Sequence, residues 1–433
     1  MMKTPIGKTA FPDIHRSVRP RAKVPNLPVL ARELVLKRLE SLSYGRLLIV
    51  EGHKTHGFGK AQADLSATIH VQDIRFYAEI AFGGSIGAGE AYMLGYWSCN
   101  ELTALVRIMV LNQSVLDRLE GGFAWLAKPF LKLFHWLNRN TEGGSRKNIA
   151  AHYDLGNELF ELFLDPTLMY SSAVFAEADM TLEQASLYKL RRVCEKLQLT
   201  EHDHVLEIGG GWGGFAIYAA KNYGSKITTT TISKAQYELA VSRIRQAGLG
   251  DRIEVLLCDY RQLRARFDKL VSIEMIEAVG HQFYDTFFAK CAALLKPAAM
   301  MLVQAITIVD QRYETAKKSV DFIQRHIFPG STIPSITALL QSVTRASDLR
   351  LFDLEDIGAH YARTLCEWRR NFFRHVERIK ALGYPDEFIR SWEFYFCYCE
   401  GGFEERALSD VQMLLVKPGN RHGVLRENRQ RKV

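Results

Sequence analysis

The sequence has no long apolar run and few cysteines for a chain of 433 residues. A helix that crosses a membrane needs about 20 consecutive apolar residues, and none of its stretches of that length is free of charge, so we expect no such helix. The basic N-terminal residues are not followed by a continuous apolar segment, which predicts no secretory signal. The seven cysteines are scattered and odd in number, which is typical of free thiols in the cytoplasm. Cys397 and Cys399 have no second pair and the histidines lack ligand spacing, so we expect no metal site.

The positive charge is concentrated at the two ends of the chain. Residues 1–40 hold nine Lys and Arg against three acidic residues, and residues 417–433 hold six against one. The net charge of +8 therefore belongs to the ends, and the rest of the chain is slightly acidic. Basic ends favour an anionic partner, either phospholipid headgroups or nucleic acid. Solvated tails would carry the same charge, so charge alone leaves these alternatives open.

Composition and periodicity divide the chain into five segments. We expect a flexible basic N-terminus over 1–25, a small α+β module over 26–120, an amphipathic connector over 121–150, a larger α/β domain over 151–420 and a basic tail over 421–433. Aromatic residues with interleaved lysines form the connector. They either lie in a membrane interface or pack the module onto the α/β domain. One helix of the module is expected to run from about Leu102 to Leu119.

Strands and helices alternate regularly in the larger domain. The runs expected to form strands are 205–208, 226–232, 253–257, 269–273 and 300–308. This alternation predicts a mostly parallel, Rossmann-like sheet whose ligand lies beyond the carboxyl ends of the strands. Lys296-Pro297 is expected to separate the last helix from the last strand.

The first of these strands enters a glycine-rich turn, Gly209-Gly-Gly-Trp-Gly-Gly214. Glycines allow a tight turn and a close approach of the backbone to a ligand at a helix N-terminus. A dinucleotide site would need a carboxylate after the second strand, but Thr231 and Ser233 stand there. No Gly-Lys-Ser/Thr follows the turn, which excludes a P-loop. The run Leu206-Glu-Ile-Gly-Gly-Gly211 resembles motif one of the class I S-adenosylmethionine-dependent methyltransferases.

A series of further motifs narrows this resemblance. In chain order they are His152-Tyr-Asp-Leu-Gly-Asn157, Asp165-Pro166, Tyr170-Ser171, the glycine turn, Thr231-Ile-Ser-Lys-Ala-Gln236, Asp259-Tyr-Arg261, Ile327-Phe-Pro-Gly330 and Pro334-Ser335. Over about 145–416 the chain resembles the cyclopropane-fatty-acyl-phospholipid synthase and mycolic acid cyclopropane synthase family. Residues 26–120 resemble the N-terminal extension of its phospholipid-acting branch. The resemblance implies transfer of the methyl carbon of S-adenosylmethionine to the cis double bond of unsaturated acyl chains in membrane phospholipids.

The resemblance also implies a set of residues around the cofactor. They are Tyr170, Ser171, Gly209, Gly210, Gly211, Thr231, Ser233, Gln236, Asp259 and Tyr260. In this set the glycine turn contacts the methionine part of the cofactor, and Asp259 with Tyr260 lies near its adenine. Thr231 and Gln236 are neutral hydrogen-bonding groups that replace the missing carboxylate at the ribose.

The proton acceptor of the reaction is less certain from the sequence. In ring-forming relatives it is a bound bicarbonate, held by a Cys, a Glu, a His, a Tyr and a backbone amide. The matching residues here are Ser172, Glu277, Gln304, Tyr361 and the amide of Ile306. A glutamine cannot accept a proton as histidine does, which leaves bicarbonate binding and ring closure open. A proton lost from the transferred methyl closes a ring, whereas one lost from a neighbouring chain carbon gives a methylated alkene. A methyl-branched or methylene product therefore stays open as an alternative to the ring.

Other candidate residues surround this site. Cys399 matches a cysteine assigned to the active site in this family, and Glu274 and Glu400 are alternative carboxylates at the same rim. The insertion at 310–345 interrupts the α/β alternation, and it either covers a tunnel for an acyl chain or packs as an ordinary cap.

The partners that we expect are unsaturated phospholipid acyl chains and an anionic membrane surface, without nucleic acid. This places the protein at the inner face of the cytoplasmic membrane as a peripheral protein, with a homodimer as an open alternative. Methylation of a soluble small molecule and a non-enzymatic lipid-binding role also stay open.

Overall fold

The computed structural model describes residues 27–121 and 155–421 of the chain. The expected basic N-terminus, most of the connector and of the basic tail, and residues 152–154 of the first motif lie outside the described residues. The expectations for these segments stay predictions. Within the described ranges, no helix is both long and apolar enough to cross a membrane.

The first part of the chain folds into a small α+β unit around a four-stranded sheet of order β2-β1-β3-β4. The strands are β1 (Arg46–Glu51), β2 (Lys54–Gly59), β3 (Ser66–Val71) and β4 (Trp97–Cys99). The helices are α2 (Leu27–Leu39), α3 (Arg75–Met93), α4 (Leu102–Leu111) and α5 (Gln113–Gly121). Alternating side chains of β1 and β3, such as Leu47, Ile49 and Ile69, are buried, as expected where one face of a sheet packs on helices.

The single helix expected over 102–119 is wrong, because the chain breaks it at Asn112 between α4 and α5. The Asn112 amide donates to the Ile108 carbonyl oxygen at 2.7 Å, and its oxygen accepts from the backbone N–H groups of Ser43 at 2.8 Å and Tyr44 at 3.1 Å. A short polar side chain that bonds backbone groups competes with helix continuation. Asn112 thereby fixes the helix pair to the loop before β1.

The second part of the chain is built on a seven-stranded sheet of order β10-β11-β9-β8-β5-β6-β7. Its strands are β5 (His204–Ile208), β6 (Lys226–Thr231), β7 (Ile253–Leu257), β8 (Phe267–Ile273), β9 (Leu295–Ile308), β10 (Arg350–Asp356) and β11 (Leu408–Val416). Strands β5 to β9 run parallel, and β11 pairs antiparallel with both β9 and β10. The predicted mostly parallel α/β sheet is confirmed.

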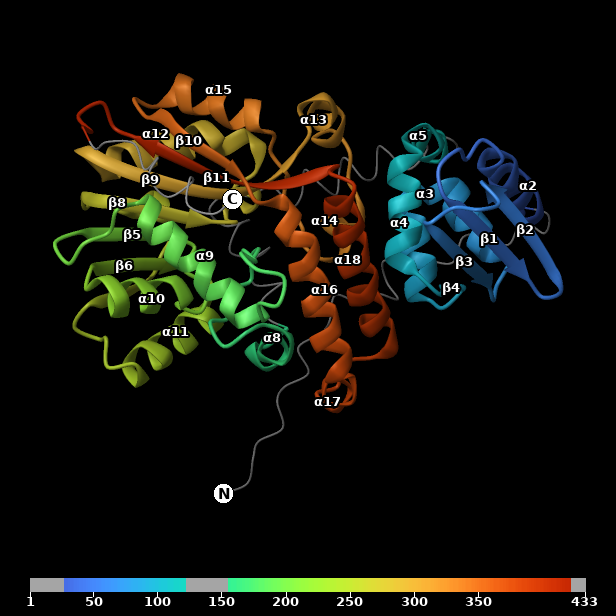
Figure 1. Ribbon diagram of the computed structural model, residues 1–433, viewed down its shortest axis with the longest axis horizontal. Helices are drawn as coiled ribbons and strands as arrows, with labels where there is room; N and C mark the ends of the chain where they lie inside the picture. Colours follow the sequence, from blue (N-terminus) through green and yellow to red (C-terminus); the bar gives the residue numbers. More distant parts are fainter. Residues whose placement is uncertain (1–26, 122–154, 422–433) are drawn as a thin grey trace.

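Helices surround this sheet and connect it to the first unit. They are α8 (Asn157–Phe163), α9 (Leu182–Lys196), α10 (Gly214–Tyr223), α11 (Lys234–Gln246), α12 (Tyr284–Leu294), α13 (Asp310–Ala316), α14 (Phe322–His326), α15 (Ile336–Ala346), α16 (Gly358–Arg374), α17 (Val376–Ala381) and α18 (Asp386–Glu404). Figure 1 shows α16 and α18 between the seven-stranded sheet and the N-terminal unit. Helix α18 packs against α16 on one side and against α3 and α4 on the other.

The break expected at Lys296-Pro297 is also wrong, because β9 begins at Leu295 and runs through it. The pairing of β8 with β9 shifts register between Phe267 and Lys269, opposite this segment. A proline is tolerated in a strand at such an irregularity, where no ladder N–H is required.

Candidate active site

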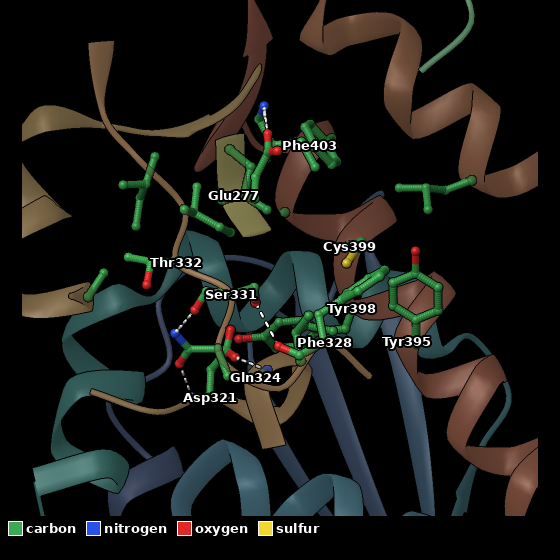
Figure 2. Close-up of a pocket in the computed structure, with 18 of the residues that line it drawn as sticks. Glu277, Asp321, Gln324, Phe328, Ser331, Thr332, Tyr395, Tyr398, Cys399 and Phe403 are labelled. Atoms are coloured by element: carbon green, nitrogen blue, oxygen red, sulfur yellow. Dashed lines mark hydrogen bonds between the residues drawn. The ribbon is translucent and has the colours of Figure 1, made fainter. Parts of the chain in front are cut away.

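A large cavity of about 1180 Å³ joins the carboxyl ends of the parallel strands to the interior of the N-terminal unit. A pocket for one small ligand usually spans about 300–1,000 Å³, so this cavity has room for a second ligand. Its far end is lined by apolar residues of α3 and α4, such as Ile80 and Leu105, and its middle by residues of α18 and of the insertion. Figure 2 shows Phe328, Tyr395, Tyr398 and Cys399 along this middle part.

The glycine turn after β5 forms one wall of the cavity. Gly209 has φ +84° and Gly211 has φ +53°, a left-handed conformation that favours glycine. The N–H groups of Gly209 and Gly210 donate to the Thr230 carbonyl oxygen at 3.1 and 2.9 Å, and a Cβ on Gly210 would lie only 1.8 Å from Thr229 Oγ1. A Cβ on Gly211 would meet nothing within 4 Å. The turn is therefore fixed on one side and exposes bare backbone to the cavity on the other.

Polar groups follow the next two strands at the same edge. Thr231 Oγ1 donates to Gln236 Oε1 at 2.8 Å, and both residues line the cavity. Asp259 lies 2.6 Å from the Arg261 guanidinium and lines the cavity with Tyr260. A set of neutral hydrogen-bonding groups followed by a carboxylate fits the sugar and base of a nucleoside.

The other residues predicted to contact the cofactor divide between the cavity wall and a helix cap. Tyr170 and Ser171 line the cavity. Ser233 does not, because its hydroxyl caps α11 by accepting from the Gln236 N–H at 3.3 Å. Its predicted contact with the cofactor stays a prediction.

The residues predicted to hold an anion gather around Glu274, directly after β8. Its Oε1 accepts from the Ser172 backbone N–H at 2.7 Å and from Gln304 Nε2 at 2.8 Å, and its Oε2 accepts from the Tyr361 hydroxyl at 2.6 Å. Glu274 lines the cavity, whereas the Ser172 and Gln304 side chains are fully buried behind it. The sequence grouped Ser172, Gln304 and Tyr361 with Glu277. In the structure all three donate to Glu274 instead.

Glu277 lies beside this group and accepts fewer hydrogen bonds than Glu274. Its Oε1 accepts from the Ile306 backbone N–H at 2.6 Å, and its buried Oε2 has no hydrogen-bond partner among the described residues. The sequence predicted that both groups hold an anion, which stays a prediction. Figure 2 shows it next to Phe403 at one end of the cavity. Burial and the negative charge of Glu274 raise the pKa of Glu277 to about 8, so its carboxyl is largely protonated at neutral pH.

Two buried ionisable residues, Lys189 and Asp410, complete the cluster. Lys189 is fully buried and its Nζ donates to Ser171 Oγ at 2.8 Å; burial lowers its pKa to about 8. Gln304 Nε2 also donates to Asp410 Oδ2 at 2.8 Å, and burial together with the charge of Glu274 raises the pKa of Asp410 well above its usual range. Burial raises the pKa of Glu274 above its usual value, and the Tyr361 and Ser172 donors and the Lys189 charge offset part of this rise.

Sequence reasoning missed both Lys189 and Asp410. A signal existed, because Asp410 directly precedes the apolar run of β11 and Lys189 lies among the apolar residues on the buried face of α9. Charged residues at such positions are almost always paired, but their partners lie far away in the sequence.

Cys399 lines the middle of the cavity on α18. Burial raises the pKa of its thiol well above the usual value, so the thiol stays protonated at neutral pH. Because the thiolate is the reactive form, this environment favours a wall residue over a nucleophile.

Glu277→Gln is expected to raise stability increasingly as the pH increases. A carboxyl whose pKa rises from 4.5 unfolded to about 8 folded binds its proton more tightly in the folded state. Wild-type stability is therefore lost as the pH rises between these values, and a glutamine removes this loss. Thermal unfolding at pH 5, 6.5 and 8 measures it, with about 2–4 °C of Tm for each kcal/mol.

The matched control is Glu238→Gln on α11, whose side chain is 63% exposed. A constant Tm difference between the Glu277 variant and wild type across this pH range would contradict the assignment of a raised pKa.

Together, a parallel sheet, a bare glycine turn after its first strand and nucleoside-fitting groups after the next two define a class I S-adenosylmethionine-dependent methyltransferase. Residues 141–413 match the model of the mycolic acid cyclopropane synthetase family. The chain belongs to this family, and S-adenosylmethionine is its co-substrate.

Individual relatives resemble most of the chain. It is 36% identical over 412 residues to the tuberculostearic acid methyltransferase of Mycobacterium tuberculosis, covering 92% of this chain and 95% of that protein. It is also 36% identical over 361 residues to the cyclopropane-fatty-acyl-phospholipid synthase of Escherichia coli K12, covering 83% and 88%. A solved mycolic acid cyclopropane synthase complexed with SAH and CTAB is 29% identical with a TM-score of 0.59, covering 63% of this chain and 98% of that one.

Proposed function

We propose that this enzyme transfers the methyl carbon of S-adenosylmethionine to the cis double bond of an unsaturated acyl chain in a membrane phospholipid. The observation that carries the proposal is the cavity, which begins at the glycine turn and continues as an apolar passage into the N-terminal unit. A long apolar passage suits a hydrocarbon chain, whereas a small polar substrate would leave most of it unfilled. The relatives named for fatty-acid and phospholipid substrates support the same class of substrate.

The chemistry needs an electron-rich alkene and a dry site. The bound co-substrate supplies an electrophilic methyl group on a sulfonium. The π electrons of the alkene form the new carbon–carbon bond as the methyl–sulfur bond breaks, leaving SAH and a carbocation on the acyl chain. The stacked rings of Tyr361 and Phe403, with centroids 4.5 Å apart, line the cavity beside Glu277. Aromatic faces stabilise a cation, and the apolar walls exclude the water that would quench it.

We infer that the product is an open-chain, methyl-branched alkene rather than a cyclopropane. In ring-forming relatives an anion held partly by Cys and His takes the last proton. Here the corresponding Ser172 hydroxyl donates to the Ala173 carbonyl oxygen at 3.0 Å, and Gln304 is bound to Glu274 and Asp410. Neither residue lines the cavity. The tuberculostearic acid methyltransferase, which matches 92% of the chain, is consistent with this product.

A cyclopropane product is the second candidate. Glu277, Tyr361 and the Ile306 amide match the ring-forming arrangement, and the Glu277 carboxyl accepts from the Ile306 N–H at 2.6 Å. The similarity to the Escherichia coli synthase favours the same product.

Expression in a host without such enzymes, fed methionine with a deuterated methyl group, tests the function and separates the products. A methyl-branched alkene that loses a chain proton keeps all the deuterium of the transferred methyl and takes up hydrogen under mild hydrogenation. A ring loses one deuteron and resists hydrogenation, and a methylene product loses one but is reduced. Mass spectrometry of the phospholipid fatty acids reads each result, and unchanged fatty acids would refute the proposal.

We further propose that the protein works on the anionic inner face of the cytoplasmic membrane. The basic ends of the chain support this, because each Lys or Arg near such a surface contributes about 1 kcal/mol. Co-sedimentation is expected to be strong with phosphatidylglycerol vesicles at low salt and to weaken as salt increases. Equal binding to zwitterionic vesicles, or methylation of soluble small molecules alone, would contradict this placement.

A further inference from the structure

Glu274 lies where the glycine turn (Gly209–Gly214) meets the apolar part of the cavity. It lines the cavity, and the next residue, Met275, lies against the turn: a Cβ on Gly209 would be 2.7 Å from Met275 Cγ. Its carboxylate accepts three hydrogen bonds, from the Ser172 backbone N–H, the Gln304 amide and the Tyr361 hydroxyl. Hydrogen bonds donated to a carboxylate favour its ionised, proton-accepting form and oppose the effect of burial.

The charged groups around Glu274 differ from those around the two nearby carboxyls, Glu277 and Asp410. Buried Lys189 provides a positive charge, and the carboxyl of Asp410 shares Gln304 as a hydrogen-bond donor. Among the described residues Glu277 accepts one hydrogen bond, from the Ile306 N–H, whereas Glu274 accepts three. Burial and the nearby charge of Glu274 raise the pKa values of Glu277 and Asp410. Of the three carboxyls, Glu274 is the one that both lines the cavity and has three donors to stabilise its charge, which suits it to accept a proton.

The backbone at Glu274 is itself unusual. Its φ is +48°, a left-handed conformation in which glycine is the usual residue. Its N–H donates to the Gln304 carbonyl oxygen at 2.8 Å, which holds the main chain in place. Strained positions that are held by their surroundings concentrate at functional sites.

The side chain also closes the position that a dissolved anion would need. Ser172 and Gln304 are fully buried and do not line the cavity, and the Ser172 backbone N–H and the Gln304 amide both donate to the Glu274 carboxylate, which does. A bicarbonate ion could use these donors only if the Glu274 side chain were absent.

We propose that Glu274 is the catalytic base of this enzyme and replaces a dissolved anion such as bicarbonate. This inference rests on the proposed function, because it assigns the last step of that reaction. A Glu274 oxygen takes a proton from the carbocation, and the electrons of the broken C–H bond form the new carbon–carbon bond of the product. The positive charge of the chain is thereby removed, and the carboxylate becomes a carboxylic acid.

Three proteins test the proposal: wild type, Glu274→Gln and Glu274→Gly. In buffer freed of carbon dioxide, wild-type turnover with oleoyl phospholipid is expected to be unchanged. Glu274→Gln keeps the shape but removes the base, so turnover falls about 100-fold or more, with affinity for S-adenosylmethionine unchanged. Glu274→Gly suits the backbone conformation and opens the anion position, so added bicarbonate or formate is expected to raise its turnover about tenfold or more. Glu238→Gln is the control for a carboxylate outside the site.

A wild type that needs bicarbonate, or a fully active Glu274→Gln, would overturn the proposal. Binding of ¹³C-bicarbonate, followed by NMR, tests it without turnover: Glu274→Gly should bind the ion and wild type should not. Bicarbonate binding by wild type refutes the role of Glu274 even if no lipid is methylated. A wild type that excludes bicarbonate and methylates no lipid refutes the proposed function instead.

Discussion

Replacing Gly211 by leucine is expected to weaken S-adenosylmethionine binding about 100-fold, a loss of roughly 3 kcal/mol, while the protein stays folded. The Cβ of residue 211 would meet no protein atom within 4 Å, so the new side chain extends into the cavity where the cofactor must approach the backbone. Isothermal titration calorimetry with S-adenosylmethionine and SAH measures the loss.

Gly248→Leu is the matched control for this prediction. Gly248 also has a positive φ, +68°, with open space around its Cβ position, but it follows α11 outside the cavity. Both variants bear the same backbone strain, about 1–2 kcal/mol, so only the position relative to the cavity differs. Equal cofactor affinity in the two variants would mean that the turn is not the binding surface.

Filling the passage at Cys399 is the second substitution with a large expected effect. Cys399→Trp is expected to lower turnover with oleoyl phospholipid about 100-fold, because a misplaced chain cannot present its double bond to the sulfonium. The affinity for S-adenosylmethionine should not change, since this residue lies along the acyl passage. Turnover and calorimetry on the same preparations separate the two effects.

Cys399→Ala completes this test. It widens the passage and removes the thiol, and turnover should stay within about threefold of wild type. Loss of activity in the alanine variant would indicate thiol chemistry. Full activity in the tryptophan variant would place the acyl chain elsewhere.

Local patterns were enough to predict the centre of the sheet. The short apolar and β-branched runs that became β5 to β8 are bounded by glycine and polar turns, so their type and direction follow from sequence. The antiparallel strand β11 pairs with β9 across about 100 residues of chain, and its place depends on how α16 and α18 pack. No local pattern carries that information, and the interruption at Asn112 likewise depends on its contacts with the loop before β1.

In the site, too, some residues could be predicted from local sequence and others depend on distant contacts. The glycine turn, Thr231, Gln236 and Asp259 follow their strands directly, so the parallel sheet brings them to one edge. Glu274 and Glu277 are three residues apart, and the sequence alone could not decide which one accepts from the Tyr361 hydroxyl. The backbone conformation at residue 274 and the positions of donors from three other segments determine that Glu274 accepts these hydrogen bonds.

A crystal structure of the enzyme with SAH and an oleoyl phospholipid would test the shared basis of these proposals most directly. We expect the sulfur at Gly209–Gly211, the acyl chain along the passage past Cys399, and the double bond between the sulfur and the Glu274 carboxylate. An acyl chain outside the cavity, or SAH bound away from the turn, would contradict the account.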